Sequence, residues 1–364
     1  MNPRGVRPRQ HPHAPRPRLA WILAVALMLG AGAPAGAPAV AAEGGRAVWG
    51  VADGAGSGPG SPGTSASADT VPDTDFWVDP NSAAARQAAE WRSQGRTDDA
   101  RLIERIADRP QGVWLYGPSP GPTVRAATVA ATAERRTAVL VAYFIPHRDC
   151  GDYSEGGAAS AAEYRQWVDE FAEGIGDRAA YVIVEPDAIA QGVSGCAKAD
   201  TYERYGLLAY AVNRIKARPH ARVYLDAGNS SWIPAVSRLV APLREAGIAR
   251  ADGFALNVSN YQTNEVTSEY GNQLSAALGG GEHFVVDSSR NGNGPYAGDG
   301  VQPWCNPPGR ALGTPPTTRT GAPALDAYLW IKRPGESDGT CRGGPRAGQW
   351  WPEYALGLAS RAKG

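Results

Sequence analysis

Short apolar runs that alternate with amphipathic stretches are the feature that most limits how this chain can fold. Amphipathic stretches with apolar residues at helical spacing cover 159–176, 201–217 and 234–247. This alternation is typical of parallel strands covered by helices, and seven such units fit a closed or nearly closed barrel better than an open sheet. The predicted strands are residues 113–117, 138–145, 180–185, 222–227, 253–259, 283–287 and 326–332.

The first 72 residues differ in composition from the rest. Residues 1–18 contain five arginines and no acid, 19–30 are apolar, and small residues follow to 42. This order is typical of a secretory signal peptide, and its apolar run is too short to span a bilayer. Residues 43–72 are rich in Gly, Ser, Ala and Pro and predict a flexible linker or tail. We therefore expect a signal peptide at 1–42, a folded domain at 73–364, and an extracellular protein that does not contact the membrane once the signal is cleaved.

Charge and cysteine content narrow the possible partners. The whole chain has 36 basic and 36 acidic residues, so loss of the signal leaves an excess of acid and no basic stripe for nucleic acid. Four cysteines in an exported chain suggest two disulfides, with three possible pairings. No two cysteines have the Cys-x-x-Cys spacing, and the histidines outside the signal are scattered. We therefore expect no metal site and no cofactor.

One strand ends in a carboxylate that is placed for chemistry. The run 181–184 is followed by Glu185, Pro186 and Asp187. Proline cannot donate to a sheet ladder, so pairing should stop there and leave Asp187 at the carboxyl end of a central strand. When Asp187 is considered alone, a role as the N-cap of the next helix explains it equally well.

Polar side chains follow the other predicted strands in the same way. Each of them on its own can be explained as a helix cap or a solvent-exposed acid. In a barrel, however, the whole set would converge on one rim. The sequence has neither a phosphate-binding glycine loop nor a Gly-x-Ser-x-Gly elbow. The chemistry that remains is proton transfer by carboxylates. In secreted proteins, glycoside hydrolysis is the commonest reaction of this kind. Indole faces suit the C–H faces of sugars, which supports this choice. The polar side chains that follow these strands are Tyr143, Arg148, Asp149, Asp226, Asn260, Asp287, Arg290, Lys332, Glu336 and Asp338, and the tryptophans are Trp114, Trp232 and Trp304.

Several long motifs in series are similar to a known family. From about Asp75 onward the chain resembles the catalytic domain of glycoside hydrolase family 6, and most closely its bacterial endo-β-1,4-glucanases. The motifs are Val141-x-Tyr143-x-x-Pro146-x-Arg148-Asp149-Cys150-Gly151, Val182-Ile183-Val184-Glu185-Pro186-Asp187, Asp226-Ala227-Gly228, Asn257-x-Ser259-Asn260-Tyr261, Ser289-Arg290-Asn291-Gly292-Asn293-Gly294 and Leu329-Trp330-Ile331-Lys332-x-Pro334-Gly335-Glu336-x-Asp338-Gly339.

The resemblance implies a distorted, seven-stranded parallel (β/α) barrel that is similar to a TIM barrel and cleaves cellulose with inversion. By motif position Asp187 is the general acid, Asp149 keeps it protonated and helps to activate water, and Asp338 is the candidate base. Asp226 is the fourth catalytic carboxylate and, like Lys332 and Glu336, matches a substrate-binding position. Substrate contacts are also implied for Tyr143, Arg148, Asn260, Trp114, Trp232 and Trp304, and disulfides for Cys150–Cys196 and Cys305–Cys341.

Two positions depart from the family pattern, and two other functions stay open. Asn229 stands where His is usual, and Glu155 adds a carboxylate to a loop with the composition of a mobile lid. A cellobiohydrolase on the same scaffold would need longer loops to roof the cleft, so we expect an open cleft and internal cutting. A non-catalytic glycan-binding protein would not need all of its catalytic carboxylates. We expect a monomer whose partner is a β-1,4-glucan.

Overall fold

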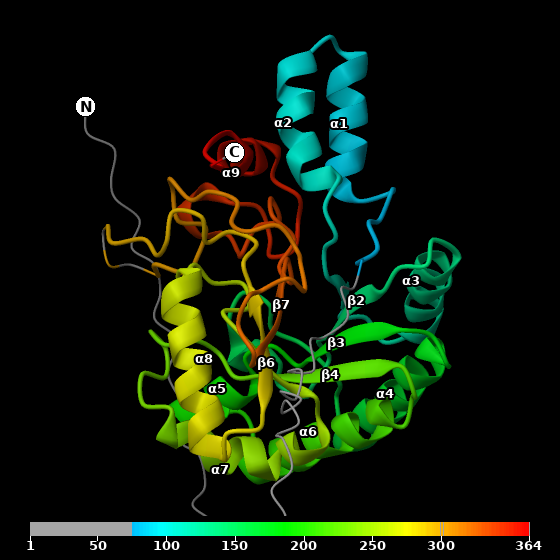
Figure 1. Ribbon diagram of the computed structural model, residues 1–364, viewed down its shortest axis with the longest axis vertical. Helices are drawn as coiled ribbons and strands as arrows, with labels where there is room; N and C mark the ends of the chain where they lie inside the picture. Colours follow the sequence, from blue (N-terminus) through cyan, green and yellow to red (C-terminus); the bar gives the residue numbers. More distant parts are fainter. Residues whose placement is uncertain (1–74, 299, 301, 364) are drawn as a thin grey trace, which may run out of the picture. The chain divides into compact units, whose positions relative to one another are not determined.

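The strands form one parallel sheet whose order follows the chain. The computed structural model describes residues 75–298, 300 and 302–363, so the predicted signal peptide and linker lie outside the described residues. The sheet curls, and the predicted α/β fold with a distorted seven-stranded barrel is confirmed (Figure 1). The strands are β1 (Val113–Leu115), β2 (Ala138–Ala142), β3 (Ala180–Val184), β4 (Ala221–Asp226), β5 (Gly253–Leu256), β6 (His283–Asp287) and β7 (Leu325–Leu329).

Helices follow the strands and cover the outside of the sheet (Figure 1). The predicted amphipathic stretches correspond to α4, α6 and α7. In the described residues the α-helices are α1 (Ala83–Ser93), α2 (Thr97–Ala107), α3 (Gly121–Ala133), α4 (Ala161–Ile175), α5 (Ala188–Ser194), α6 (Thr201–Lys216), α7 (Ser237–Glu245), α8 (Asn264–Leu278) and α9 (Pro352–Ser360), and the 3₁₀ turns are η1 (Asp149–Gly151), η2 (Ile248–Arg250) and η3 (Cys341–Gly343).

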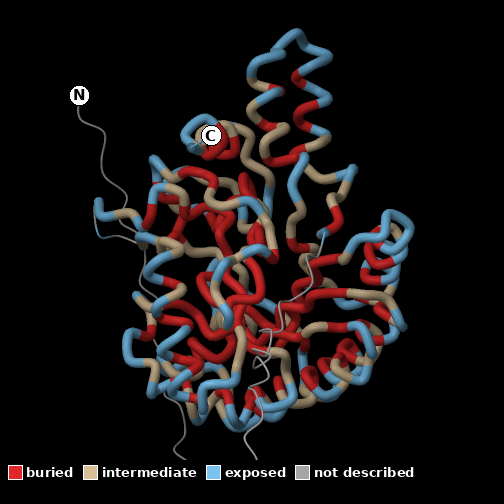
Figure 2. The backbone as a smooth tube through the Cα atoms, viewed as in Figure 1, coloured by how far each residue is buried: buried red, intermediate tan, exposed pale blue. Residues whose placement is uncertain are grey.

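Successive side chains of each strand belong to two different layers. In β2, Leu140 packs with the helices in the outer core, whereas Val139 and Val141 belong to the cluster inside the barrel. This is the two-residue period of a strand, and burial on both faces explains why β2 and β3 contain no charged residue. Figure 2 shows the buried strands enclosed by helices with exposed outer faces.

Several strands end earlier than the sequence predicts, because the backbone turns into left-handed conformations. Glu185 has φ 47° and Asn257 has φ 65°, so β3 stops at Val184 and β5 at Leu256. Beyond β2, the amides of Phe144 and Ile145 donate to the Glu185 carboxylate instead of a strand. The residues after the strands are therefore loops that line the rim.

The barrel is nearly closed by the segments beside β1 and β7. No ladder joins these two strands in the described residues, but the Gly112 amide donates to the Trp330 carbonyl at 2.8 Å. The Trp114 indole also donates to the Ile331 carbonyl at 2.8 Å. A Cβ at Gly112 would lie 2.5 Å from the Ile331 carbonyl oxygen, so this approach requires glycine.

A helical hairpin of α1 and α2 adds a small separate core beside α9 (Figure 1). The Ser82 hydroxyl caps α1 by accepting from the Ala85 amide, and Arg105 of α2 donates to the Ala359 carbonyl at 3.1 Å. Trp330, just after β7, packs into the same core and joins the hairpin to the barrel. Within the part of the chain that the structure describes, no helix combines the length and the apolar character that a membrane crossing needs.

Candidate active site

A cleft of about 1370 Å³ lies at the carboxyl ends of the strands. Among the predicted catalytic residues, Asp226 is fully buried behind the cleft and does not line it. Of the four cysteines, Cys150 and Cys196 line the cleft, and Cys305 and Cys341 do not. The other residues predicted as catalytic or substrate-binding all line it: Trp114, Tyr143, Arg148, Asp149, Asp187, Trp232, Asn260, Trp304, Lys332, Glu336 and Asp338.

Asp187 is held in an uncommon backbone conformation at the end of β3. It occupies the N-cap position of α5 with φ 73°, but its side chain makes no capping hydrogen bond. The capping explanation of this residue is therefore wrong. Burial raises the pKa of the Asp187 carboxyl well above its usual range, and the charges of Asp226 and Asp149 add to the rise. A non-glycine residue in this conformation, with a carboxyl that favours its protonated form, is typical of a functional site.

Asp226 orders the backbone that carries Asp187. Its Oδ2 accepts hydrogen bonds from the amide of Asp187 at 2.9 Å and from the amide of Gly228 at 3.2 Å. Burial raises the pKa of Asp226 to about 7, although these two amides favour its charged form. Asp226 therefore acts on Asp187 from behind the cleft, through the backbone and by its charge.

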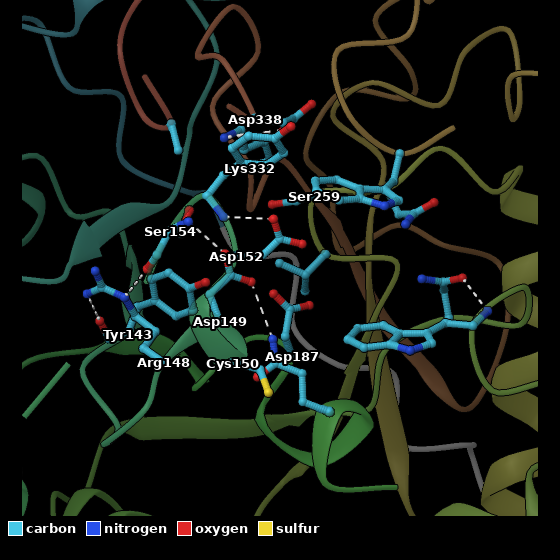
Figure 3. Close-up of a pocket in the computed structure, with 18 of the residues that line it drawn as sticks. Tyr143, Arg148, Asp149, Cys150, Asp152, Ser154, Asp187, Ser259, Lys332 and Asp338 are labelled. Atoms are coloured by element: carbon cyan, nitrogen blue, oxygen red, sulfur yellow. Dashed lines mark hydrogen bonds and ion pairs between the residues drawn. The ribbon is translucent and has the colours of Figure 1, made fainter. Parts of the chain in front are cut away.

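Asp149 approaches from the loop after β2 (Figure 3). Its Oδ2 accepts from the Ser154 amide at 2.6 Å, and its Oδ1 accepts from the Gln191 side chain at 3.3 Å. Burial raises the pKa of Asp149 to about 6. In Figure 3, Asp149 and Asp187 lie below Lys332 and Asp338. A carboxyl with this pKa can exchange a proton near neutral pH.

Asp338 has an environment that favours its charge. Its Oδ2 accepts from Arg290 at 2.8 Å and from the amide of Asn306 at 3.0 Å. The ammonium group of Lys332 lies 3.6 Å from Oδ1. Burial alone would raise the pKa of Asp338, but the positive charges of Arg290 and Lys332 outweigh burial and lower it. A carboxylate held in this way remains ionised and is a weak base.

Arg148 is occupied by the backbone of its own loop. Its guanidinium donates to the carbonyls of Ser154 at 2.8 Å and Tyr143 at 3.0 Å. It also lies over the Tyr143 ring, 4.9 Å from the centroid. The Tyr143 ring meets Trp114 edge to face at 5.1 Å. Arg148 therefore fixes the loop and the aromatic wall of the cleft.

The remaining predicted residues form the rim. Asn229, at the position where His is usual, is buried, and its Oδ1 accepts from the amide of Trp232 and from the amide and hydroxyl of Ser231. Asn229 thus shapes the turn that carries Trp232. Glu336 pairs with Arg333 at 3.0 Å. Asn260 and Trp304 complete the rim, where the Asn260 side chain accepts from the amide of Tyr261.

The loop after Asp149 is tied at several points. Glu155, the extra carboxylate of this loop, faces Lys198 at 3.8 Å. The Tyr153 hydroxyl donates to the side chain of Gln302 at 3.2 Å, and its ring meets Trp304 at 6.0 Å. The cleft that the sequence predicts as open is therefore bordered by two loops in contact. The structure contains the disulfides expected from the resemblance, Cys150–Cys196 and Cys305–Cys341.

Some residues of the site were missed or differ from expectation. Gln191, which contacts Asp149, was missed, because no local signal distinguishes it from an ordinary helix residue. Arg290 was expected on the rim but is fully buried, where it contacts Asp338. Asp287 was expected on the rim, but it is fully buried and accepts from three loop amides, including those of Ser259 and Lys332. Among the described residues, no group of three or more His, Cys, Asp or Glu side chains could hold a metal ion.

Comparison with known proteins identifies relatives of this chain. Residues 71–362 match the family model described as glycosyl hydrolases family 6. Endoglucanase A of Cellulomonas fimi is 45% identical over 80% of this chain, and the match spans 62% of that relative. Endoglucanase 1 of Streptomyces halstedii is 43% identical over 77% of this chain and 87% of the relative. The structure of the endoglucanase Cel6 from Mycobacterium tuberculosis, in complex with methyl-cellobiosyl-4-deoxy-4-thio-β-D-cellobioside, has a TM-score of 0.75 and 45% identity, covering 81% of this chain and 99% of that one.

Proposed function

Because the chain belongs to glycosyl hydrolase family 6, we propose that it is a secreted endo-β-1,4-glucanase that hydrolyses internal bonds of cellulose with inversion. The observation that carries this proposal is the carboxyl of Asp187, which is half-buried just after β3 on the wall of the cleft and favours its protonated form. Tryptophans at 114, 232 and 304 on the cleft wall support a glucan substrate.

Asp187 is the general acid of the proposed reaction. It donates its proton to the departing glycosidic oxygen, a poor leaving group as an alkoxide. Burial and the charges of Asp226 and Asp149 raise its pKa, so it keeps the proton until the bond breaks. Tyr143 lies beside these carboxyls and crowds the sugar at the cleavage point.

Asp149 takes part in activating the water that attacks from the opposite face of the sugar. With a pKa raised to about 6, it is ionised at neutral pH and can accept a proton through water. Asp338 is the alternative base, but its ion pair with Arg290 favours a fixed negative charge instead. Lys332 and Glu336 then bind sugar hydroxyls beside it.

Secretion is supported by the two disulfides, which form and persist in oxidising compartments. In the proposal, the mature enzyme is a monomer that acts on soluble and amorphous glucan outside the cell. Mass spectrometry of the culture supernatant tests this, because a secreted chain should lack residues 1–42 and contain no free thiol.

Carboxymethylcellulose tests the function. An endoglucanase lowers its viscosity well before many reducing ends appear, and Asp187→Ala should abolish both signals. Asp177→Ala changes an exposed aspartate that precedes β3 and should behave as the wild type. Release of cellobiose from the start without loss of viscosity would favour a cellobiohydrolase, for which the contact between Tyr153 and Gln302 would serve as part of a roof. Binding without hydrolysis would favour a glycan-binding protein. Proton NMR of the first products should show the α-anomer.

A further inference from the structure

A buried arginine on α6 joins the two segments that carry Asp149 and Asp187. One end of the Arg204 guanidinium donates to the carbonyls of Pro146 and His147, at 3.2 and 3.0 Å, just before the Asp149 loop. Its other end donates to the Ala188 carbonyl at 3.3 Å and to Gln191 Oε1 at 3.2 Å, both on α5. Arg204 is 2% exposed, so these bonds are made away from water.

Arg204 also fixes the orientation of the Gln191 side-chain amide. A guanidinium has donors and no acceptor, so Gln191 must turn its oxygen toward Arg204. Its NH₂ group then faces the other way, where it donates to Asp149 Oδ1 at 3.3 Å. Gln191 stands one helical turn after Asp187, and its amide donates to the Asp187 carbonyl at 2.8 Å.

We propose that Gln191 is a positioning residue for the reaction, which Arg204 orients so that it holds the Asp149 carboxylate at a fixed place relative to Asp187. The inference rests on the proposed function for its catalytic meaning. In structural terms, the proposal is a relay of hydrogen bonds from Arg204 through Gln191 to Asp149. This relay acts in addition to the disulfide that joins Cys150 to Cys196. No reacting atom is contacted by Arg204, which acts only through the relay.

A donor to a carboxylate favours its charged form, so loss of the Gln191 NH₂ should raise the pKa of Asp149. Other charges near Asp149 stay in place in such a variant. On its own loop these are Arg148 and Asp152, and from neighbouring elements Tyr143 after β2, Asp187 at α5, and Lys198, whose ammonium lies against Gly151.

Two variants of Gln191 test the relay. Gln191→Leu removes the donor, whereas Gln191→Glu keeps the size and the contact with Arg204 but replaces the donor with a carboxylate. In both, the acidic limb of the pH profile of kcat/KM should move up by on the order of 1 pH unit, because Asp149 must be ionised to act. KM should change less than kcat. Gln273→Leu makes the same replacement at an exposed position of α8 and should leave the profile unchanged.

A second measurement does not depend on activity. In protein labelled at the aspartate carboxyl carbon, the ¹³C signal of Asp149, assigned with Asp149→Asn, should titrate at higher pH in both variants than in the wild type. If Gln191→Glu keeps the wild-type titration and profile, Gln191 only packs α5 and the proposal is overturned. If the wild type does not hydrolyse glucan, the proposed function fails, and the titration still decides whether the relay exists. Arg204→Lys, which keeps the charge without the fork, should shift the Asp149 signal in the same direction if the Gln191 variants do not fold.

Discussion

The backbone amide of Asp187 donates a hydrogen bond to Oδ2 of Asp226 across 2.9 Å. This contact ties the half-buried Asp187, which lines the cleft, to the fully buried carboxyl of Asp226 behind it. Because both cannot be charged at low cost, ionisation of one raises the pKa of the other. In addition to burial, a residue that the substrate does not need to touch therefore raises the pKa of Asp187.

Asp226→Asn should lower the upper pH limit of activity. An asparagine oxygen can still accept from the Asp187 amide, but it carries no charge. The wild-type Asp226, whose pKa burial raises to about 7, is ionised above that pH and there keeps Asp187 protonated. Without it, the pKa of Asp187 falls, and the basic limb of the kcat/KM profile should move down by about 1 pH unit. An unchanged or raised limb would contradict this coupling, and Asp98→Asn, at an exposed position of α2, serves as the control.

Asp187→Ala separates leaving-group protonation from the other steps. Hydrolysis of carboxymethylcellulose should fall by about 10²–10⁴-fold, the usual contribution of general acid catalysis. A 2,4-dinitrophenyl cellobioside has a leaving group that departs without a proton, so its hydrolysis should be largely retained. Steady-state rates on the two substrates give the comparison. Equal losses on both would remove Asp187 from this role and make Asp149 the next candidate.

Neighbouring residues show how far the sequence could predict this site. The continuous apolar run 181–184 and Pro186 were enough to predict β3 and a carboxylate beyond it. The sequence analysis singled out Asp187 for chemistry and assigned no role to Glu185, which stands two residues earlier. Glu185 is buried because its oxygens accept from the amides of Phe144 and Ile145, and this depends on the pairing of β2 with β3.

Long-range partners escaped prediction for a similar reason. Arg290 and Asp338 belong to motifs that the sequence analysis singled out, but they come from different loops, 48 residues apart, and only the folded barrel brings them to 2.8 Å. Likewise Asp226 was expected among the cleft residues, but it is the last residue of β4 and lies buried behind the cleft. Residue type and order predicted the chemistry of the rim, whereas the assignment of each carboxyl to a role requires the contacts.

Arg290→Met should destabilise the protein at pH 7. Arg290 is fully buried and pairs with Asp338, so its loss leaves a buried carboxylate for which Lys332, at 3.6 Å, is the remaining cation partner among the described residues. Removal of one member of a buried pair costs about 3–5 kcal/mol of unfolding free energy. Arg101→Met removes an exposed pair with Asp98 and should cost at most about 1 kcal/mol.

Denaturant unfolding of Arg290→Met, of Asp338→Asn and of the double variant Arg290→Met/Asp338→Asn provides the measurement, with Arg101→Met as the control. In the double variant the unpaired charge is gone, so its loss of stability should be smaller than the sum of the two single losses. Additive losses would mean that the two side chains do not depend on each other.

Glu185→Gln should change how stability depends on pH. Burial raises the pKa of Glu185 to about 7 from an ordinary value of 4.5. The folded wild type therefore holds a proton that the unfolded chain releases, and the stability linked to this proton is complete below about pH 4.5 and is lost as the pH rises through about 7. Glutamine is neutral throughout, so the free energy of unfolding of Glu185→Gln relative to the wild type should rise by up to about 3 kcal/mol between pH 4.5 and 8. The other buried carboxyls titrate in both proteins and cancel in this difference.

Urea unfolding at a series of pH values measures the difference between Glu185→Gln and the wild type, with Glu173→Gln on the exposed face of α4 as the control. A difference that stays constant or falls with pH would show that Glu185 is ionised in the folded protein across this range, stabilised by the two amides that it accepts from.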